Sequence, residues 1–243
     1  MNRVVVITGA SSGLGLSLAQ KFVESGDSVY GLSRTRKSWK VAKRAVPDSK
    51  RFFLSQVDVT SERAVKQFLR GVYQQTKKLD VLVNNAGYSN RPTRVEDLTL
   101  KEFEKTLFAN LISAFLMCKY ALPIFENQKR GLIINISSMA GKRAVPGLAA
   151  YSASKFGMVD FSQCVAKESK SSRINCIAVC PGGMNTKLRA RLFGREDAEK
   201  QQPTVAVADL ILDVINGKIK VGSGGDIVIR HGAITAINPS PDT

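Results

Sequence analysis

Short apolar runs alternate along this chain with segments in which apolar residues recur every three or four positions. The runs predict strands over residues 3–7, 28–32, 52–57, 81–83, 132–136, 174–179 and 226–229. The spaced segments predict helices at 14–23, 64–72, about 100–127, around Tyr151 and at 210–215, with the long helix interrupted near Pro123. Such a succession is typical of a parallel sheet covered on both faces. We therefore predict an α/β fold with a doubly wound, Rossmann-like parallel sheet of about seven strands, forming one domain over residues 1–243.

The bulk composition adds limits on location. No apolar run approaches the ~18 residues that a membrane span needs. The opening run at 4–7 is too short for a signal peptide. The four cysteines have no C-x-x-C spacing and no nearby histidine, which favours buried thiols in a reducing compartment over a redox role. We expect a cytoplasmic protein without a bound metal.

The net charge of +16 makes nucleic acid or an acidic partner conceivable. The positive residues are spread along the chain, however, and no segment interleaves them with aromatic residues as a base-stacking surface would. Nucleic-acid binding is therefore disfavoured. The densest basic run, residues 34–44, is consistent either with a solvated helix face or with a local phosphate site.

A glycine-rich turn, residues 8–15, lies directly between the first predicted strand and the first predicted helix. Glycines allow a tight turn and a close approach of the backbone to a ligand. The start of the helix offers unpaired N–H groups and a positive dipole end to a phosphate. The turn therefore predicts a nucleotide site, the alternative being a tight turn that binds nothing. Its spacing differs from G-x-G-x-x-G.

The end of the second predicted strand reads Gly31-Leu32-Ser33-Arg34, without an acidic residue. An Asp or Glu at this point would bind the ribose 2′-hydroxyl of NAD. Asp27 precedes the strand and is expected at its opposite end. Because a guanidinium suits a 2′-phosphate, Ser33 and Arg34 favour NADP(H) over NAD(H).

Three polar residues could move a proton at neutral pH without a histidine. Tyr151 and Lys155 are spaced to share one helix face, and Ser138 follows the predicted strand 132–136. A cation close to a phenol favours the phenolate, so we expect Lys155 to lower the pKa of Tyr151. Positioned donors of this kind stabilise the charge that develops on a carbonyl oxygen during hydride addition.

Together these motifs resemble those of the short-chain dehydrogenase/reductase family over nearly the whole chain. Besides the glycine turn, Ser138, Tyr151 and Lys155, the matching motifs are Asn84-Asn85-Ala86-Gly87 after the fourth strand, Asn110 in the long helix, and Pro181-Gly182-Gly183-Met184-Asn185-Thr186 after the sixth. Size and motif set are similar to 3-oxoacyl-carrier-protein reductases. The segment Ile229-Arg230-His231-Gly232 departs from that subgroup, so a general carbonyl, sugar or steroid dehydrogenase stays open.

The resemblance implies roles for individual residues. Tyr151 would be the general acid or base, Lys155 would hold the nicotinamide ribose, Ser138 would bind the substrate oxygen, and the backbone carbonyl of Asn110 would support a water that leads to Lys155. Asp58 and Val59 would border adenine. The expected cofactor-binding residues are Thr8, Gly9, Ser11, Ser12, Gly13, Leu14, Gly15, Ser33, Arg34, Asp58, Val59, Asn84, Ala86, Gly87, Tyr151, Lys155, Pro181, Gly182, Met184 and Thr186.

Several alternatives accompany these roles. Ser137 could replace Ser138 as the functional hydroxyl, Asn84 and Asn85 could serve only the backbone at a strand end, and Asn110 could be an ordinary polar helix residue. A second hypothesis is a binding protein that keeps the fold and senses NADP without turnover. The presence of Ser138, Tyr151 and Lys155 argues against it.

The segment 181–203 is expected to cover the substrate. Its basic residues are consistent either with a mobile solvated lid or with attraction of an anionic substrate or acidic carrier protein: Lys187, Arg189, Arg191, Arg195 and Lys200. The apolar faces of the long helix and the Tyr151 helix, the latter with Ser154, Met158, Phe161 and Val165, predict a homodimer or homotetramer by family resemblance.

Overall fold

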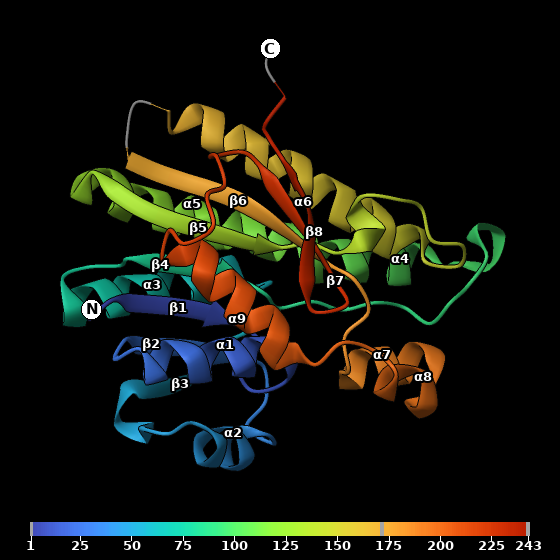
Figure 1. Cartoon of the computed structure of the whole chain (residues 1–243), viewed down its shortest axis with the longest axis horizontal. Helices are drawn as coiled ribbons and strands as arrows, with labels where there is room; N and C mark the ends of the chain where they lie inside the picture. The colour runs from blue at the N-terminus through green and yellow to red at the C-terminus, as the bar shows by residue number, and fades with distance from the viewer. Residues whose placement is uncertain (1, 171–172, 242–243) are drawn as a thin grey trace.

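Successive residues of the central strands point to opposite faces of one sheet, and both faces are apolar. In the computed structural model, which describes residues 2–170 and 173–241, eight strands form this sheet (Figure 1). The strands are β1 (Val4–Thr8), β2 (Ser28–Ser33), β3 (Phe52–Gln56), β4 (Val81–Asn84), β5 (Arg130–Ile136), β6 (Arg173–Pro181), β7 (Asp226–Arg230) and β8 (Ala233–Asn238).

The strand order is β3-β2-β1-β4-β5-β6-β7-β8, and β1 to β7 run parallel. The chain therefore reverses its direction of travel across the sheet between β1 and β4, where doubly wound folds bind their ligands. The final strand, β8, pairs antiparallel with β7. It was missing from the sequence prediction because its residues alternate between half-buried and exposed instead of forming a continuous apolar run.

Helices cover both faces. Their bounds are α1 (Gly13–Glu24), α2 (Trp39–Ala45), α3 (Glu62–Thr76), α4 (Leu100–Leu107), α5 (Ser113–Gln128), α6 (Ala149–Glu168), α7 (Lys187–Phe193), α8 (Arg195–Glu199) and α9 (Thr204–Ile215). Apolar residues of α1 and α9 pack with Val5 and Ile7 of β1 on one face, and those of α3, α5 and α6 pack with Val4 and Val6 on the other. The predicted fold class is confirmed.

The long helix is continuous from Leu100 to Gln128, and the predicted interruption at Pro123 is wrong. Pro123 is exposed, so the backbone carbonyl that it leaves unpaired faces water, while Ala121 and Phe125 are buried and hold the helix on the sheet. The irregularity lies earlier, in a π-helical segment at Phe108–Ile112 between α4 and α5.

By length and composition this helix could cross a membrane, which the sequence prediction had excluded. Its residues Leu116, Met117, Ala121 and Phe125 are nevertheless buried in the core against the sheet, as in the core helix of a folded domain. The predicted apolar stripe of α6 is also internal, since Ser154, Met158 and Val165 are buried. The large apolar side chains that these helices do expose are Leu100, Phe108, Phe115 and Phe156.

Candidate active site

Two cavities lie along the carboxyl ends of the parallel strands. The first, about 280 Å³, follows β1, β2, β3 and β4, and we call it the hydroxyl-lined cavity. The second, about 420 Å³, contains Tyr151, and we call it the tyrosine cavity. In Figure 1 the arrow of β1 points toward the side of the molecule on which α7 and α8 lie.

Most of the predicted cofactor residues line one of the two cavities. The hydroxyl-lined cavity includes Gly9, Ser11, Ser12, Ser33, Arg34, Asp58, Val59, Ala86 and Gly87. The tyrosine cavity includes Ser138, Tyr151, Pro181, Gly182, Met184 and Thr186. The predicted residues that line neither are Thr8, Gly13, Leu14, Gly15, Asn84, Asn110 and Lys155.

The glycine turn is built to bring the chain close to β4. Gly9 and Gly13 adopt φ values of +69° and +55°, which favour glycine. A Cβ on Gly15 would lie 2.4 Å from the carbonyl oxygen of Gly9, so this position has no room for a side chain. Thr8 has a structural role, because its hydroxyl accepts hydrogen bonds from the backbone N–H groups of Asn85 and Ala86 at 2.9 and 2.8 Å.

Serine hydroxyls cluster at the end of β2. Ser38 Oγ donates to Ser11 Oγ at 2.8 Å, and Ser11 Oγ donates to Ser33 Oγ at 3.2 Å. The side chain of Arg34 is exposed beside them and has no ion pair or hydrogen bond with any residue that the structure describes. The sequence analysis did not predict Ser38, which lines the cavity from the N-terminal end of α2, outside the glycine turn and the segment Gly31–Arg34.

The acidic residues that flank β2 and β3 are already engaged. Asp27 is fully buried at the opposite end of β2, where its carboxylate accepts from the backbone and guanidinium of Arg3, as predicted from its position. Asp58 lines the cavity, but its Oδ1 accepts from the N–H and hydroxyl of Thr60 at 3.0 and 2.7 Å.

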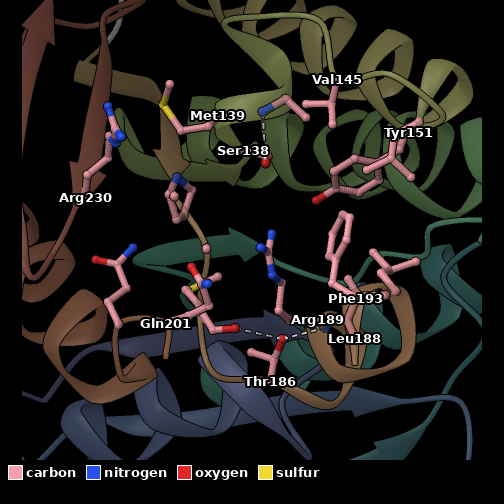
Figure 2. Close-up of a pocket in the computed structure, with 18 of the residues that line it drawn as sticks. Ser138, Met139, Val145, Tyr151, Thr186, Leu188, Arg189, Phe193, Gln201 and Arg230 are labelled. Atoms are coloured by element: carbon pink, nitrogen blue, oxygen red, sulfur yellow. Dashed lines mark hydrogen bonds between the residues drawn. The ribbon is translucent and has the colours of Figure 1, made fainter. Parts of the chain in front are cut away.

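Ser138 and Tyr151 extend their oxygen atoms into the tyrosine cavity from the same side, with Thr186, Leu188 and Arg189 across from them (Figure 2). Ser138 has an extended backbone after β5, and its Oγ accepts from the N–H of Ala140 at 3.1 Å. Tyr151 lies in the first turn of α6. Burial raises the pKa of the Tyr151 hydroxyl, although its ring keeps some exposure, and the Ser138 side chain acts in the opposite direction.

Lys155 lies behind Tyr151 and is buried. Its Nζ is 5.7 Å from the Tyr151 ring centroid and donates to the carbonyl oxygen of Ile136 at 2.7 Å. Burial lowers its pKa to about 8. The expected lowering of the Tyr151 pKa by Lys155 is therefore not found, because burial dominates the pKa of the phenol. The ammonium has three donors, and the described residues offer it only that carbonyl and the Met158 sulfur at 3.9 Å.

The choice between the two serines follows from their surroundings. Ser137 is buried, and its hydroxyl donates to the backbone carbonyl of Lys155 at 2.8 Å, which fixes α6 against β5. The Ser138 side chain is partly exposed in the cavity. Ser138 therefore keeps the hydroxyl that a substrate could reach.

Asn110 is more than an ordinary polar helix residue. It is fully buried in the π-helical segment, where its Oδ1 accepts from Tyr88 N–H at 2.8 Å and its Nδ2 donates to Ser154 Oγ at 2.8 Å. A Cβ on Gly87 would lie 3.0 Å from Asn110 Oδ1 and 3.9 Å from Lys155 Nζ. Asn110 therefore holds the loop after β4 beside Lys155.

Asn84 points into the interior. Its Nδ2 donates to Asn135 Oδ1 at 2.8 Å, and Asn135 in turn donates to Ser162 at 2.9 Å. The Asn84 amide therefore lies in the interior, where it joins β4 to β5, and it lines neither cavity. Leu14 and Gly15 are likewise buried within α1.

The cysteines are mostly internal. Burial raises the pKa of Cys118 to about 12 and that of Cys180 to about 11, and it also raises the pKa of Cys176. Cys164 is exposed, contrary to the prediction, since it lies on the outer face of α6.

The segment 181–203 contains the helices α7 and α8. Thr186 caps α7 by accepting from Arg189 N–H at 3.1 Å, and its Cγ2 lies 3.5 Å from the Cβ position of Gly13. Acidic residues that the prediction overlooked neutralise three of its cations in the pairs Arg189–Asp197, Arg195–Glu199 and Lys200–Glu196.

Comparisons with known proteins agree with this geometry. The family model described as short chain dehydrogenase matches residues 3–197. The chain is 32% identical to 2-(R)-hydroxypropyl-CoM dehydrogenase of Xanthobacter autotrophicus over 98% of its own length and 100% of that protein. It is 34% identical to a 3-oxoacyl-[acyl-carrier-protein] reductase of Synechocystis over 78% and 77% of the two chains. The solved structure of ElxO with NADP bound superposes with a TM-score of 0.86, at 26% identity, over 94% and 97%.

Proposed function

The chain belongs to the short chain dehydrogenase family, and we propose that it is an NADP-dependent oxidoreductase that reversibly reduces a carbonyl group to an alcohol. The observation that carries this proposal is the convergence of Ser138 and Tyr151 on one cavity, with the ammonium of Lys155 buried behind them. We treat residues 1–243 as one nicotinamide-binding domain.

In this proposal the cofactor supplies or accepts the hydride, and the protein orients the substrate and moves the proton. The raised pKa of Tyr151 keeps its hydroxyl protonated at neutral pH, which suits a general acid for the carbonyl oxygen. Ser138 donates a hydrogen bond to that oxygen. The Lys155 ammonium favours the phenolate left after proton transfer, and Asn110 holds the neighbouring backbone.

The residues present fit a nicotinamide dinucleotide. The spare donors of Lys155 suit ribose hydroxyls, and the crowded Gly15 position with the left-handed Gly9 suits a phosphate against the start of α1. Pro181, Gly182, Met184 and Thr186 are assigned to the nicotinamide end.

The preference for NADP(H) is supported by the end of β2. Arg34 offers a charge and free donors to a 2′-phosphate beside the hydroxyls of Ser11, Ser33 and Ser38, which donate in sequence to one another and to the carbonyl oxygen of Thr35. Asp58, the acidic residue of this cavity, already accepts from Thr60. The similar solved structures include ElxO with NADP bound and a 3-ketoacyl-(acyl-carrier-protein) reductase of Brucella melitensis complexed with NADH, so the proposed preference rests on Arg34 and its surroundings.

For the substrate we propose two candidate classes. A 3-oxoacyl thioester, presented by coenzyme or by an acidic carrier protein, is supported by the relative that bears that activity in its name. A general carbonyl, sugar or steroid substrate is the second candidate, since the relatives include dehydrogenases of other substrates. We further propose a homodimer or homotetramer through the face with Phe108, Phe115 and Phe156, in a reducing cytoplasm.

The test follows NADPH oxidation over a panel of acetoacetyl thioesters, carrier-protein conjugates, sugars, steroids and quinones. With any substrate that is reduced, Tyr151→Phe is expected to lower kcat by about 10²- to 10⁴-fold, because the proton donor is lost. NADPH affinity, measured by fluorescence titration, is expected to stay nearly unchanged.

The matched control is Tyr120→Phe, which removes a phenol bound to Glu62 at 2.8 Å, outside both cavities. It is expected to leave kcat unchanged. Unchanged turnover in Tyr151→Phe would refute the assigned role. NADPH binding without reduction of any compound in the panel would instead favour the sensor.

A further inference from the structure

Positive charge on the wall of the tyrosine cavity has no matching acid there. The cations that line it are Arg143, Arg189, Lys200 and Arg230, and none of the described residues that line it is Asp or Glu. A cavity lined by one sign of charge attracts ligands of the opposite sign.

Two of these cations are compensated by neighbours and two are not. Arg189 is paired with Asp197, and Lys200 Nζ lies 2.6 Å from Glu196. Within residues 2–170 and 173–241, the side chains of Arg143 and Arg230 form neither an ion pair nor a hydrogen bond. Their guanidinium groups are therefore available to a ligand.

Arg230 is held in place by its backbone and its stem. The preceding carbonyl, that of Ile229, accepts from Gly182 N–H at 2.7 Å and from Gln202 Nε2 at 3.2 Å. On the other side, Gly232 N–H donates to Gln202 Oε1 at 2.9 Å. The Cγ of Arg230 lies 3.3 Å from the Cβ position of Gly182, so its aliphatic stem packs on this glycine. Arg230 is itself an exposed residue, so these contacts fix the start of its side chain and leave the guanidinium accessible.

The opposite wall is mainly apolar, and a cation that lies over it, Arg189, is paired with Asp197 and is 4.1 Å from the Phe193 ring centroid. Figure 2 places Arg230 and Gln201 on one side of the cavity and Val145, Phe193 and Leu188 on the other, with the Ser138 and Tyr151 oxygens between them. A molecule whose carbonyl oxygen meets Ser138 and Tyr151 would therefore present one substituent to apolar side chains and the other to a guanidinium.

We propose that the tyrosine cavity selects a small oxo compound with an anionic group, a carboxylate or an equivalent oxyanion, and that Arg230 binds this group. The planar guanidinium matches such an anion through two parallel hydrogen bonds. This inference rests on the proposed carbonyl reduction and adds the substrate class to it.

The experiment compares levulinate and its two next longer homologues with their methyl esters, using NADPH at low salt. The acid is expected to have a kcat/KM about tenfold or more above its ester for at least one chain length. In Arg230→Gln the ratio of acid to ester is expected to fall to about one, mainly through a higher KM for the acid. Arg230→Lys is expected to keep an intermediate ratio, because the charge remains without the planar fork.

The matched control is Arg195→Gln, which removes the same charge from the neighbouring segment, where Arg195 is paired with Glu199 and does not line the cavity. It is expected to keep the wild-type ratio. Equal values for acid and ester in the wild type, or an undiminished preference in Arg230→Gln, would overturn the inference. Reduction confined to carrier-protein conjugates would also overturn it, in favour of a protein-docking role for the charge.

Thermal-shift titration with the same acids and esters in the presence of NADPH separates the two proposals, because it needs no turnover. Preferential stabilisation by the acid that is lost in Arg230→Gln supports the anion site even if no ketone is reduced. Reduction of the esters without any preference for the acid leaves the proposed function intact and removes only this inference.

Discussion

The hydroxyl-lined cavity and the tyrosine cavity lie along the same edge of one sheet, but they are built from different parts of the chain. The first consists almost wholly of turns that directly follow β1, β2, β3 and β4. The second includes residues that follow β5 and β6, such as Ser138 and Pro181, and takes the rest of its lining from the β5–α6 loop, α6, α7, the residues after α8 and the β7–β8 hairpin. In the proposed assignment, cofactor recognition is thus tied to the sheet, whereas substrate recognition depends on attached segments that can vary independently.

A side chain at Gly15 would test the dependence of the first cavity on backbone contact. Because a Cβ there would lie 2.4 Å from the Gly9 carbonyl oxygen and 2.5 Å from Asn85 Nδ2, Gly15→Val is expected to lower the free energy of unfolding by about 3 kcal/mol. It should also weaken NADPH binding by at least about tenfold, since the turn must move. Urea denaturation and fluorescence titration measure the two effects.

Gly71→Val is the matched control, because Gly71 lies in α3 with no atom within 4 Å of its Cβ position. Its free energy of unfolding is expected to stay within about 0.5 kcal/mol of the wild type. If Gly15→Val behaved like this control, the tight approach of the glycine turn to β4 would have no energetic importance.

Lys155 stands between the two cavities and should impose a pH-dependent cost. Its pKa is about 8 in the folded protein against an ordinary value of 10.5, so the charged form is less favourable in the folded state. Below pH 8 both states are protonated and the full penalty of about 3 kcal/mol applies. Between pH 8 and 10.5 the unfolded chain keeps a proton that the folded protein has released, so the penalty falls as pH rises.

Lys155→Met is therefore expected to be more stable than the wild type at neutral pH by up to about 3 kcal/mol, with a difference of about 1 kcal/mol at pH 10. Denaturation curves at several pH values give this difference. Lys167→Met, which removes an exposed cation from the same helix, controls for the general effect of charge loss. A difference between wild type and Lys155→Met that did not change with pH would contradict the assigned burial penalty.

The same contrast explains what could be predicted from the sequence. The turn at 8–15 and the trio of Ser138, Tyr151 and Lys155 could be assigned because each motif follows a strand or occupies a helix of recognisable pattern. The structure brings all of them to one edge of the sheet. The sequence does not reveal which of these polar side chains face the interior, and the bond of Asn84 to Asn135 could not be predicted because Asn135 belongs to another strand.

The residues around the tyrosine cavity were harder to predict from the sequence, for a physical reason. Arg143 and Arg230 reach the tyrosine cavity from a loop and a hairpin far apart in the sequence, and no periodic pattern marks them. The hairpin itself was missed because β8 is a half-buried edge strand. Acidic residues within 196–199 were visible in the sequence. Their pairing with the basic residues of the segment 181–203 depends on the folding of α7 and α8.

Arg34 tests the cofactor preference at the outer edge of the first cavity. Because its guanidinium is unpaired among the described residues and lies beside the serine hydroxyls, Arg34→Gln is expected to lower the NADPH-to-NADH ratio of kcat/KM by about tenfold. Arg36→Gln is the control, since Arg36 donates to Gln56 at 3.2 Å and lies over Trp39. An unchanged ratio in Arg34→Gln would assign the 2′-phosphate contact elsewhere.

The smallest expected effect concerns the attachment of α7 to the rest of the substrate end. Arg191 Nη2 donates to the backbone carbonyl of Ser89 at 2.8 Å, and its guanidinium lies 5.0 Å from the ring centroid of Tyr88. Arg191→Gln should loosen this helix, which carries Leu188 and Phe193 of the cavity wall. We expect the KM of the substrate to rise about threefold with little change in kcat or in NADPH affinity, and the free energy of unfolding to fall by less than about 1 kcal/mol. Steady-state kinetics and limited proteolysis within 187–199 measure the two consequences.

Arg195→Gln is again the control, since Arg195 is paired with Glu199 inside the same segment. A loss of NADPH affinity equal to the loss of substrate affinity would show that the two cavities are coupled through α7, and the separation drawn between cofactor and substrate recognition would then not hold.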